Sequence, residues 1–130
     1  MQFETPDPGI TFEIPDHWWV IADMVDFKPP SAGFYTPSTS PFEVIELNDV
    51  EPPRRSPGVA LFKKYKLIPV LFALQSPECK LPLVQVVRIQ APKRYRFIVQ
   101  NGVHRFYASV AAGFSRLPVQ IYESDELYAL

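Results

Sequence analysis

Residues 95–122 read YRFIVQNGVHRFYASVAAGFSRLPVQIY, and this stretch decides the fold. Residues 95–100 are rich in aromatic and β-branched side chains, which predicts a strand, and Asn101-Gly102 predicts a turn into a helix. Apolar residues then recur at spacings of three and four, which is typical of an amphipathic helix. Gly113 stands where a left-handed helix end is expected, and residues 117–122 predict a returning strand. The apolar stripe of the helix comprises Val103, Phe106, Tyr107, Val110, Ala111 and Phe114.

The first turn of this predicted helix carries a basic pair, His104 and Arg105. Positive side chains at a helix N-terminus oppose the helix dipole, whereas the unpaired N–H groups there attract anions. We expect Asn101 to be the N-cap and Gly102 to let the backbone approach a ligand closely. The pattern therefore predicts a phosphate or carboxylate site. An alternative stays open, in which Arg105 points to solvent or pairs with an acid and His104 is a structural polar residue.

Three runs of this stretch resemble the second signature region of the ParB-like domain. They are GVHRFYAS at 102–109, AGF at 112–114 and LPV at 117–119. The superfamily of this domain also includes sulfiredoxin, whose corresponding run is similar to Gly-Cys-His-Arg before a helix. The resemblance is carried mainly by the glycine and the His-Arg pair at the helix start.

Upstream residues extend the resemblance toward the N-terminus. VIEL at 44–47, DV at 49–50 and PPRR at 52–55 resemble the strand and the Pro-Arg element that open such domains. The resemblance covers about residues 43–122. It implies an α+β fold of the ParB/sulfiredoxin type, which is a mixed sheet with flanking helices.

The resemblance also implies a ligand and the residues that hold it. The expected ligand is a nucleotide or a nucleic-acid backbone, and the expected cofactors are ATP or CTP with Mg²⁺. An arginine of the Pro-Arg element would clamp a second phosphate, although an exposed basic loop is an open alternative. The expected ligand-binding residues are Asn101, Gly102, Val103, His104, Arg105, Arg54 and Arg55, with Lys63 and Lys64 as further phosphate contacts.

The chain departs from the family pattern in ways that bear on activity. Val103 stands where sulfiredoxin needs a cysteine, and a hydrocarbon cannot attack a phosphoryl group or a sulfinate, so we expect no sulfiredoxin activity. We find no helix-turn-helix of the kind that follows in full-length partition proteins, so centromere-type DNA recognition is not expected. No carboxylate cluster lies near the motif to hold a catalytic metal, and nucleotide hydrolysis and nuclease activity are left open.

Length and composition indicate one domain of 130 residues. We divide it into an N-terminal β extension (1–42), the ParB-like core (43–122) and an acidic tail (123–130). The single cysteine, Cys79, excludes an intrachain disulfide and a cysteine-based zinc cluster, and an inert thiol is favoured over a nucleophile. No signal peptide is recognised, and the longest apolar run, residues 67–74, is too short to span a bilayer, so we expect a cytoplasmic protein without a membrane partner.

Charge is distributed unevenly along the chain. Residues 1–53 contain ten acids and one base, whereas residues 54–116 contain twelve bases and one acid. This separation indicates either an anionic partner for the middle segment or an acidic N-terminal cover over it. The second interpretation makes the protein a non-enzymatic interaction or regulatory module with an occluded site.

The N-terminal extension is predicted to be mostly extended. Residues 10–14 and 18–24 are candidate strands joined by a turn at Pro15-Asp16, and residues 28–41 are expected to form a surface loop. The aromatic run His17-Trp18-Trp19 is either a platform for a protein partner or, as we favour, an anchor to the core.

The middle segment is predicted to alternate strands and helices. Its expected elements are a strand at 42–47, a proline-rich turn at 49–58, helices at 59–65 and 67–75 with Pro69 in the first turn of the second, a strand at 81–89 and a turn at 91–94. Val84, Val86 and Ile89 would pack under the helix that follows. Lys63, Lys64 and Lys66 either face solvent or follow a phosphate backbone.

Overall fold

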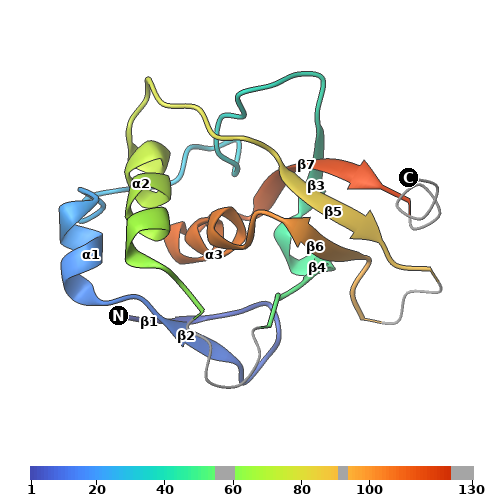
Figure 1. Ribbon diagram of the computed structural model, residues 1–130, viewed down its shortest axis with the longest axis horizontal. Coiled ribbons are helices and arrows are strands. Elements are labelled where there is room, and N and C mark those ends of the chain that lie inside the picture. The colour runs from blue at the N-terminus through green and yellow to red at the C-terminus, as the bar shows by residue number, and fades with distance from the viewer. Residues whose placement is uncertain (55–60, 91–93, 124–130) are drawn as a thin grey trace.

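The computed structural model describes residues 1–54, 61–90 and 94–123. Within these residues the protein is α+β, with a five-stranded mixed sheet, a two-stranded sheet and three α-helices (Figure 1). The elements are β1 (Gln2–Glu4), β2 (Thr11–Glu13), α1 (Asp16–Ile21), β3 (Glu43–Glu46), the 3₁₀ turn η1 (Leu47–Asp49), β4 (Val50–Glu51), α2 (Lys64–Gln75), β5 (Val84–Arg88), β6 (Phe97–Asn101), α3 (Val103–Ala112) and β7 (Arg116–Tyr122).

The five-stranded sheet has the order β3-β7-β5-β6-β4. Strand β5 is central, antiparallel to β6 and parallel to β7, while β3 is antiparallel to β7 and β4 is parallel to β6. The predicted unit of strand, glycine turn, helix and strand is therefore confirmed as β6, α3 and β7. Its two strands are not neighbours, because β5 lies between them.

Helix α3 lies between the sheet and α2, and α1 packs beside α2 (Figure 1). Val84 and Val86 of β5 are fully buried near α3, as the apolar alternation predicts, while Ile89 lies beyond the end of β5 and is half-buried. The helix ends at Gly113, whose φ of 88° is left-handed. The N–H of Phe114 donates to the carbonyl of Ser109 at 3.1 Å, which closes the predicted helix end.

The N-terminal extension is part of the same core. Strands β1 and β2 form a hairpin whose Phe12 is buried, with its ring 4.9 Å from that of Tyr107 on α3. Ile14 and Met24 are also buried in this core cluster. The strand predicted at residues 10–14 is confirmed, and it supplies large apolar side chains to the core.

The second strand predicted in the extension is wrong, because residues 16–21 form helix α1. Trp18, Trp19 and their aliphatic neighbours have strand-like propensities, but Pro15 and Asp16 are also a helix-start pair and not only a turn. The helical turn lets both indoles pack on the core, and the ring of Trp19 lies 5.5 Å from that of Phe3. Anchoring to the core is the role that these contacts support.

Helix α2 also differs from the prediction, which divided residues 59–75 into two helices. A single helix runs from Lys64 to Gln75, residues 61–63 before it are not helical, and residues 59–60 lie outside the described part. Pro69 is therefore inside the helix and not in its first turn. Leu67 and Leu71 are fully buried, and burial of this stripe outweighs the cost of an interior proline.

The connecting segments contain two further differences. Val50–Glu51, predicted as part of a turn, forms the short strand β4, because Val50 is fully buried and pairs with Phe97. Residues 28–41 form an irregular loop as expected, but Tyr35 in this loop is buried and its hydroxyl donates to the carbonyl of Pro82 at 2.6 Å. Among the described residues, no helix has the length and apolar character needed to cross a bilayer.

Candidate anion-binding site

The site begins at the junction of β6 and α3, where Gly102 alone connects the strand to the helix. Gly102 has φ 111° and ψ 34°, and its carbonyl accepts the first helical hydrogen bond, from the N–H of Phe106 at 2.8 Å. The prediction that Asn101 is the N-cap is wrong. Because Gly102 makes the turn alone, Asn101 stays in β6, paired with Gln85, and no side chain caps the helix. The N–H groups of the first turn therefore have no carbonyl partner within the helix.

Arg105 folds back against this turn. A Cβ atom placed on Gly102 would lie 3.0 Å from both Nε and Nη2 of Arg105, so only glycine leaves the guanidinium this position. The Nε atom is buried and finds no hydrogen-bond acceptor among the described residues. A buried donor without an acceptor costs free energy. The Nε–H therefore has no access to solvent, and Arg105 meets the cavity in front of α3 with the remainder of its half-buried side chain.

Tyr35 is affected by the charge of Arg105. Burial raises the pKa of the Tyr35 hydroxyl well above its usual range, and the positive charge of Arg105 partly opposes that shift. The phenol therefore stays neutral at physiological pH. It does not neutralise the guanidinium.

His104 connects the start of α3 to the segment before α2. Its Nε2 accepts a hydrogen bond from the backbone N–H of Lys63 at 3.1 Å, and its ring lies 6.1 Å from the ring of Phe62. An accepting Nε2 carries no proton, so the imidazole is neutral in this arrangement. His104 therefore holds α2 in position as well as lining the site.

A cavity of about 560 Å³ opens in front of the first turn of α3. Its basic side chains are Lys66, His104 and Arg105, and no acidic side chain is among the described residues that line it. The backbone N–H groups at the helix start add partial positive charge. The described residues that line the cavity are Tyr65, Lys66, Pro69, Val70, Gln100, Asn101, Gly102, Val103, His104 and Arg105.

The structure brings together only some of the predicted site residues. Residues 101–105 all line the cavity, and Lys63 reaches it through the hydrogen bond to His104. Lys64 is exposed and does not line it. Arg54 does not line this cavity, and its guanidinium pairs with Asp7 of the N-terminal hairpin at 3.4 Å. Arg55 lies outside the described residues.

Sequence reasoning missed the contribution of α2 to the cavity wall. Lys66, Pro69 and Val70 follow the spacing of three and four that places residues on one face of a helix. The predicted break between residues 65 and 67 hid this face. A single helix starting near Lys63 would have placed Lys66 beside His104.

The lining fits a phosphate better than it fits a metal ion. Among the described residues, no group of three or more His, Cys, Asp or Glu side chains could hold a metal. Mg²⁺ is held in proteins mainly by carboxylates, substrate phosphates and water, and no described carboxylate lines this cavity. The residues present do not fit protein-bound Mg²⁺.

Comparisons of the chain with protein-family models, with curated proteins and with solved structures found no match. The resemblance to the ParB-like domain therefore depends on the residues quoted from the sequence. The function has to be argued from the geometry of the cavity.

Proposed function

We propose that the protein is a ParB-like domain that binds a phosphate-bearing ligand, a nucleotide or a nucleic-acid backbone, in the cavity at the start of α3. One observation carries the proposal. The cavity collects the cations Lys66 and Arg105, the neutral His104 and a helix N-terminus, without a described acidic side chain to neutralise the two cations. Its volume of about 560 Å³ is in the range of small-ligand sites.

Each basic group has a separate part in this proposal. The guanidinium of Arg105, which lines the cavity, and the first N–H groups of α3 donate to phosphate oxygens, and a charged donor makes the stronger bond. Lys66 supplies a mobile point charge from the opposite wall. Tyr65, which is 69% exposed, offers a ring face at the edge of the cavity on which a base can stack.

The second candidate function is a regulatory or interaction module in which the acidic N-terminal half masks the basic segment. Asp7 favours it, because this carboxylate binds both Arg54, at 3.4 Å, and Arg94, at 2.7 Å. However, no described residue of the extension lines the cavity in front of α3. The masking interpretation therefore applies to Arg54 and Arg94 and leaves the cavity open.

We propose binding without a chemical step. Val103 presents a hydrocarbon at the position where sulfiredoxin needs its thiol. The Nε2 of His104 is already occupied by the Lys63 N–H. A bound phosphate would thus meet donors and charges but no described group placed as a nucleophile.

The test is a titration of ATP, CTP, inorganic phosphate and a short DNA duplex into the full chain at two salt concentrations. Arg105→Gln should weaken binding by about tenfold to a hundredfold, the value of a charged hydrogen bond, and Lys66→Gln by less. Lys64→Gln is the matched control, because Lys64 is a basic residue of the same helix that does not line the cavity.

Binding should also weaken as salt is added. Absence of binding for every probe would overturn the proposal. Equal losses for Lys64→Gln and Lys66→Gln would place the anion elsewhere on the basic surface. Preference for DNA over the mononucleotides would identify the nucleic-acid backbone as the ligand.

A further inference from the structure

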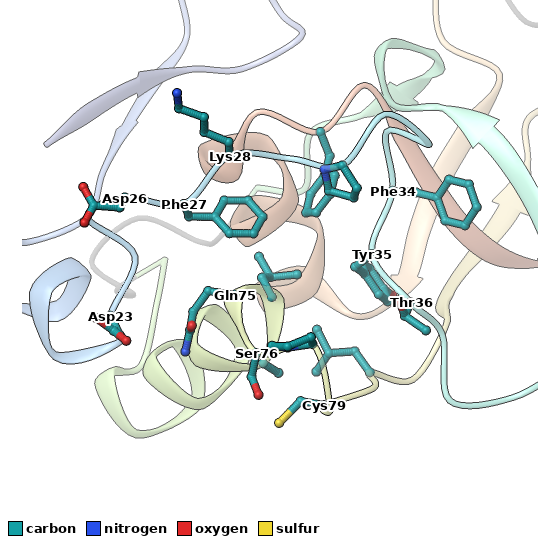
Figure 2. A pocket seen from close by; sticks show the side chains of 16 residues that line it. Asp23, Asp26, Phe27, Lys28, Phe34, Tyr35, Thr36, Gln75, Ser76 and Cys79 are labelled. Carbon is teal, nitrogen blue, oxygen red and sulfur yellow. The ribbon is translucent and has the colours of Figure 1, made fainter.

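A second cavity, of about 550 Å³, lies at the opposite end of α2 (Figure 2). One wall is the segment that follows α1, and the other is the C-terminal turn of α2 with the loop after it. The lining combines aromatic rings with polar groups. It comprises Asp23, Asp26, Phe27, Lys28, Pro30, Phe34, Tyr35, Thr36, Ala73, Leu74, Gln75, Ser76, Pro77, Cys79, Leu81 and Phe114.

The C-terminal turn of α2 lines this cavity, and the last carbonyl groups of a helix lack donors within the helix. The N–H of Ser76 donates to Phe72 at 3.1 Å, but the next residue is Pro77, which has no N–H for the carbonyl of Ala73. The last turn of α2 also carries no basic side chain. The negative end of the helix dipole is therefore not neutralised by the helix itself.

Two carboxylates add negative charge at the edge of the same cavity. Within the part of the chain that the structure describes, neither Asp23 nor Asp26 takes part in an ion pair. Figure 2 shows Asp23 beside Gln75, while Asp26 and the amino group of Lys28 point outward. Asp23 and the last turn of α2 thus line the same cavity.

Aromatic side chains form the apolar part of the wall. The ring of Phe27 is directed into the group of lining residues in Figure 2, and it packs edge-on against Phe114 at 5.8 Å. Tyr35, which also lines the cavity, is buried. Aromatic ring faces attract cations, and a wall of rings beside a carboxylate is suited to an ammonium group attached to an apolar body.

We propose that this cavity binds an organic cation, a protonated amine carried on an apolar or flat body. The two cavities lie at opposite ends of α2: Tyr65 and Lys66 at its start line the anion site, and residues 73–76 at its end line this cavity. A helix favours anions at its N-terminus and cations at its C-terminus. The proposal does not depend on the proposed function.

The test uses two probes that share a phenyl ring and differ in the sign of their charge, 2-phenylethylamine and 3-phenylpropionate. Each is titrated into the ¹⁵N-labelled full chain, and amide shifts are followed by NMR. The amine should shift the amides of Phe27, Gln75 and Cys79 and saturate with a Kd on the order of 1 mM, as expected for so small a ligand. The carboxylate probe should not saturate at these residues.

Substitutions separate charge from packing. Asp23→Asn should weaken amine binding about threefold to tenfold, and the fold should survive because asparagine tolerates the φ of 60° at this position. Lys28→Gln should strengthen amine binding, because it removes a positive charge that competes with the amine. Glu78→Gln is the control, because Glu78 follows α2 without lining the cavity and its loss should change nothing.

Any of three results would overturn the proposal. They are equal amide shifts with both probes, the absence of a saturable shift with the amine, and an unchanged affinity for the amine in Asp23→Asn. A capped phenylalanyl-lysine dipeptide amide distinguishes the two sources of the amine. Tighter binding of the dipeptide than of phenylethylamine supports a lysine side chain of a partner peptide. Weaker binding supports a free small amine.

Discussion

Replacement of Gly102 by alanine tests the argument that this glycine creates the site. At φ 111° an alanine is strained by about 1–2 kcal/mol. Its Cβ would also lie 3.0 Å from Arg105 Nε and Nη2 and 3.3 Å from Cγ1 of the buried Val84. Crowding of this kind costs about 1–3 kcal/mol. We expect Gly102→Ala to lower the free energy of unfolding by about 3.5 kcal/mol, the middle of the summed range.

The free energy of unfolding can be measured by urea titration followed by far-ultraviolet circular dichroism. Gly9→Ala is the matched control, because Gly9 also has a positive φ, 84°, but a Cβ there would meet nothing within 4 Å. In this control the free energy of unfolding should fall only by the cost of the strained backbone, about 1–2 kcal/mol. The difference between the two variants measures the contact with Arg105 and Val84.

A double-mutant cycle identifies the contact more directly. In an Arg105→Ala background the guanidinium is gone, so Gly102→Ala should cost about 1 kcal/mol less than it does in the parent chain. If Gly102→Ala costs no more than Gly9→Ala and shows no coupling to Arg105, the close approach described here does not exist. The assignment of Gly102 to the site would then be wrong.

Three further predictions concern stability. Tyr35→Phe removes the hydrogen bond to Pro82 and should lower the free energy of unfolding in urea by about 1 kcal/mol. In the parent chain, the stability that comes from the neutral phenol should be full below about pH 10, the unfolded-state pKa of tyrosine, and should fall as the pH rises toward the higher folded-state pKa of Tyr35. The Phe variant should not show this loss at high pH. Asp7→Asn removes the two ion pairs of a carboxylate that is 16% exposed, and it should lower the free energy of unfolding by about 1 kcal/mol at low salt and by less at high salt. The same loss at both salt concentrations would show that the stabilisation by Asp7 is not electrostatic. Pro69→Ala supplies an N–H inside α2 and should raise the urea midpoint of unfolding, with a gain in the free energy of unfolding of at most about 3 kcal/mol. A lower midpoint would contradict the helical geometry assigned to this residue.

The parts of the fold that sequence reasoning predicted correctly are those with strong local signals. The β6-α3-β7 unit has a regular apolar stripe and glycines at both helix ends, and these signals do not depend on the rest of the chain. Strands β2 and β3 were also predicted, from their alternation and composition. The α+β class follows from these elements.

The errors arose where tertiary contacts override local preference. The Trp18-Trp19 pair favours a strand by propensity, but packing on the core selects a helix. Pro69 suggested a helix start, yet the buried leucines of α2 continue the helix through it. From the sequence, Lys66 was expected only to face solvent or to follow a phosphate backbone, and not to form part of the cavity wall at the start of α3. The pairing of Arg54 with Asp7 joins residues 47 positions apart, and no local pattern predicts it.

The position of the N-terminal hairpin determines how this molecule can be dissected. Phe12, Ile14 and Met24 sit among the residues of the sheet and of α3, at most 6% exposed. A fragment beginning at residue 43 would leave their places empty, as if several large side chains had been deleted together, and each such deletion costs about 2–5 kcal/mol. Loss of ligand binding by that fragment would report unfolding, so the function of either half has to be measured on the undivided chain.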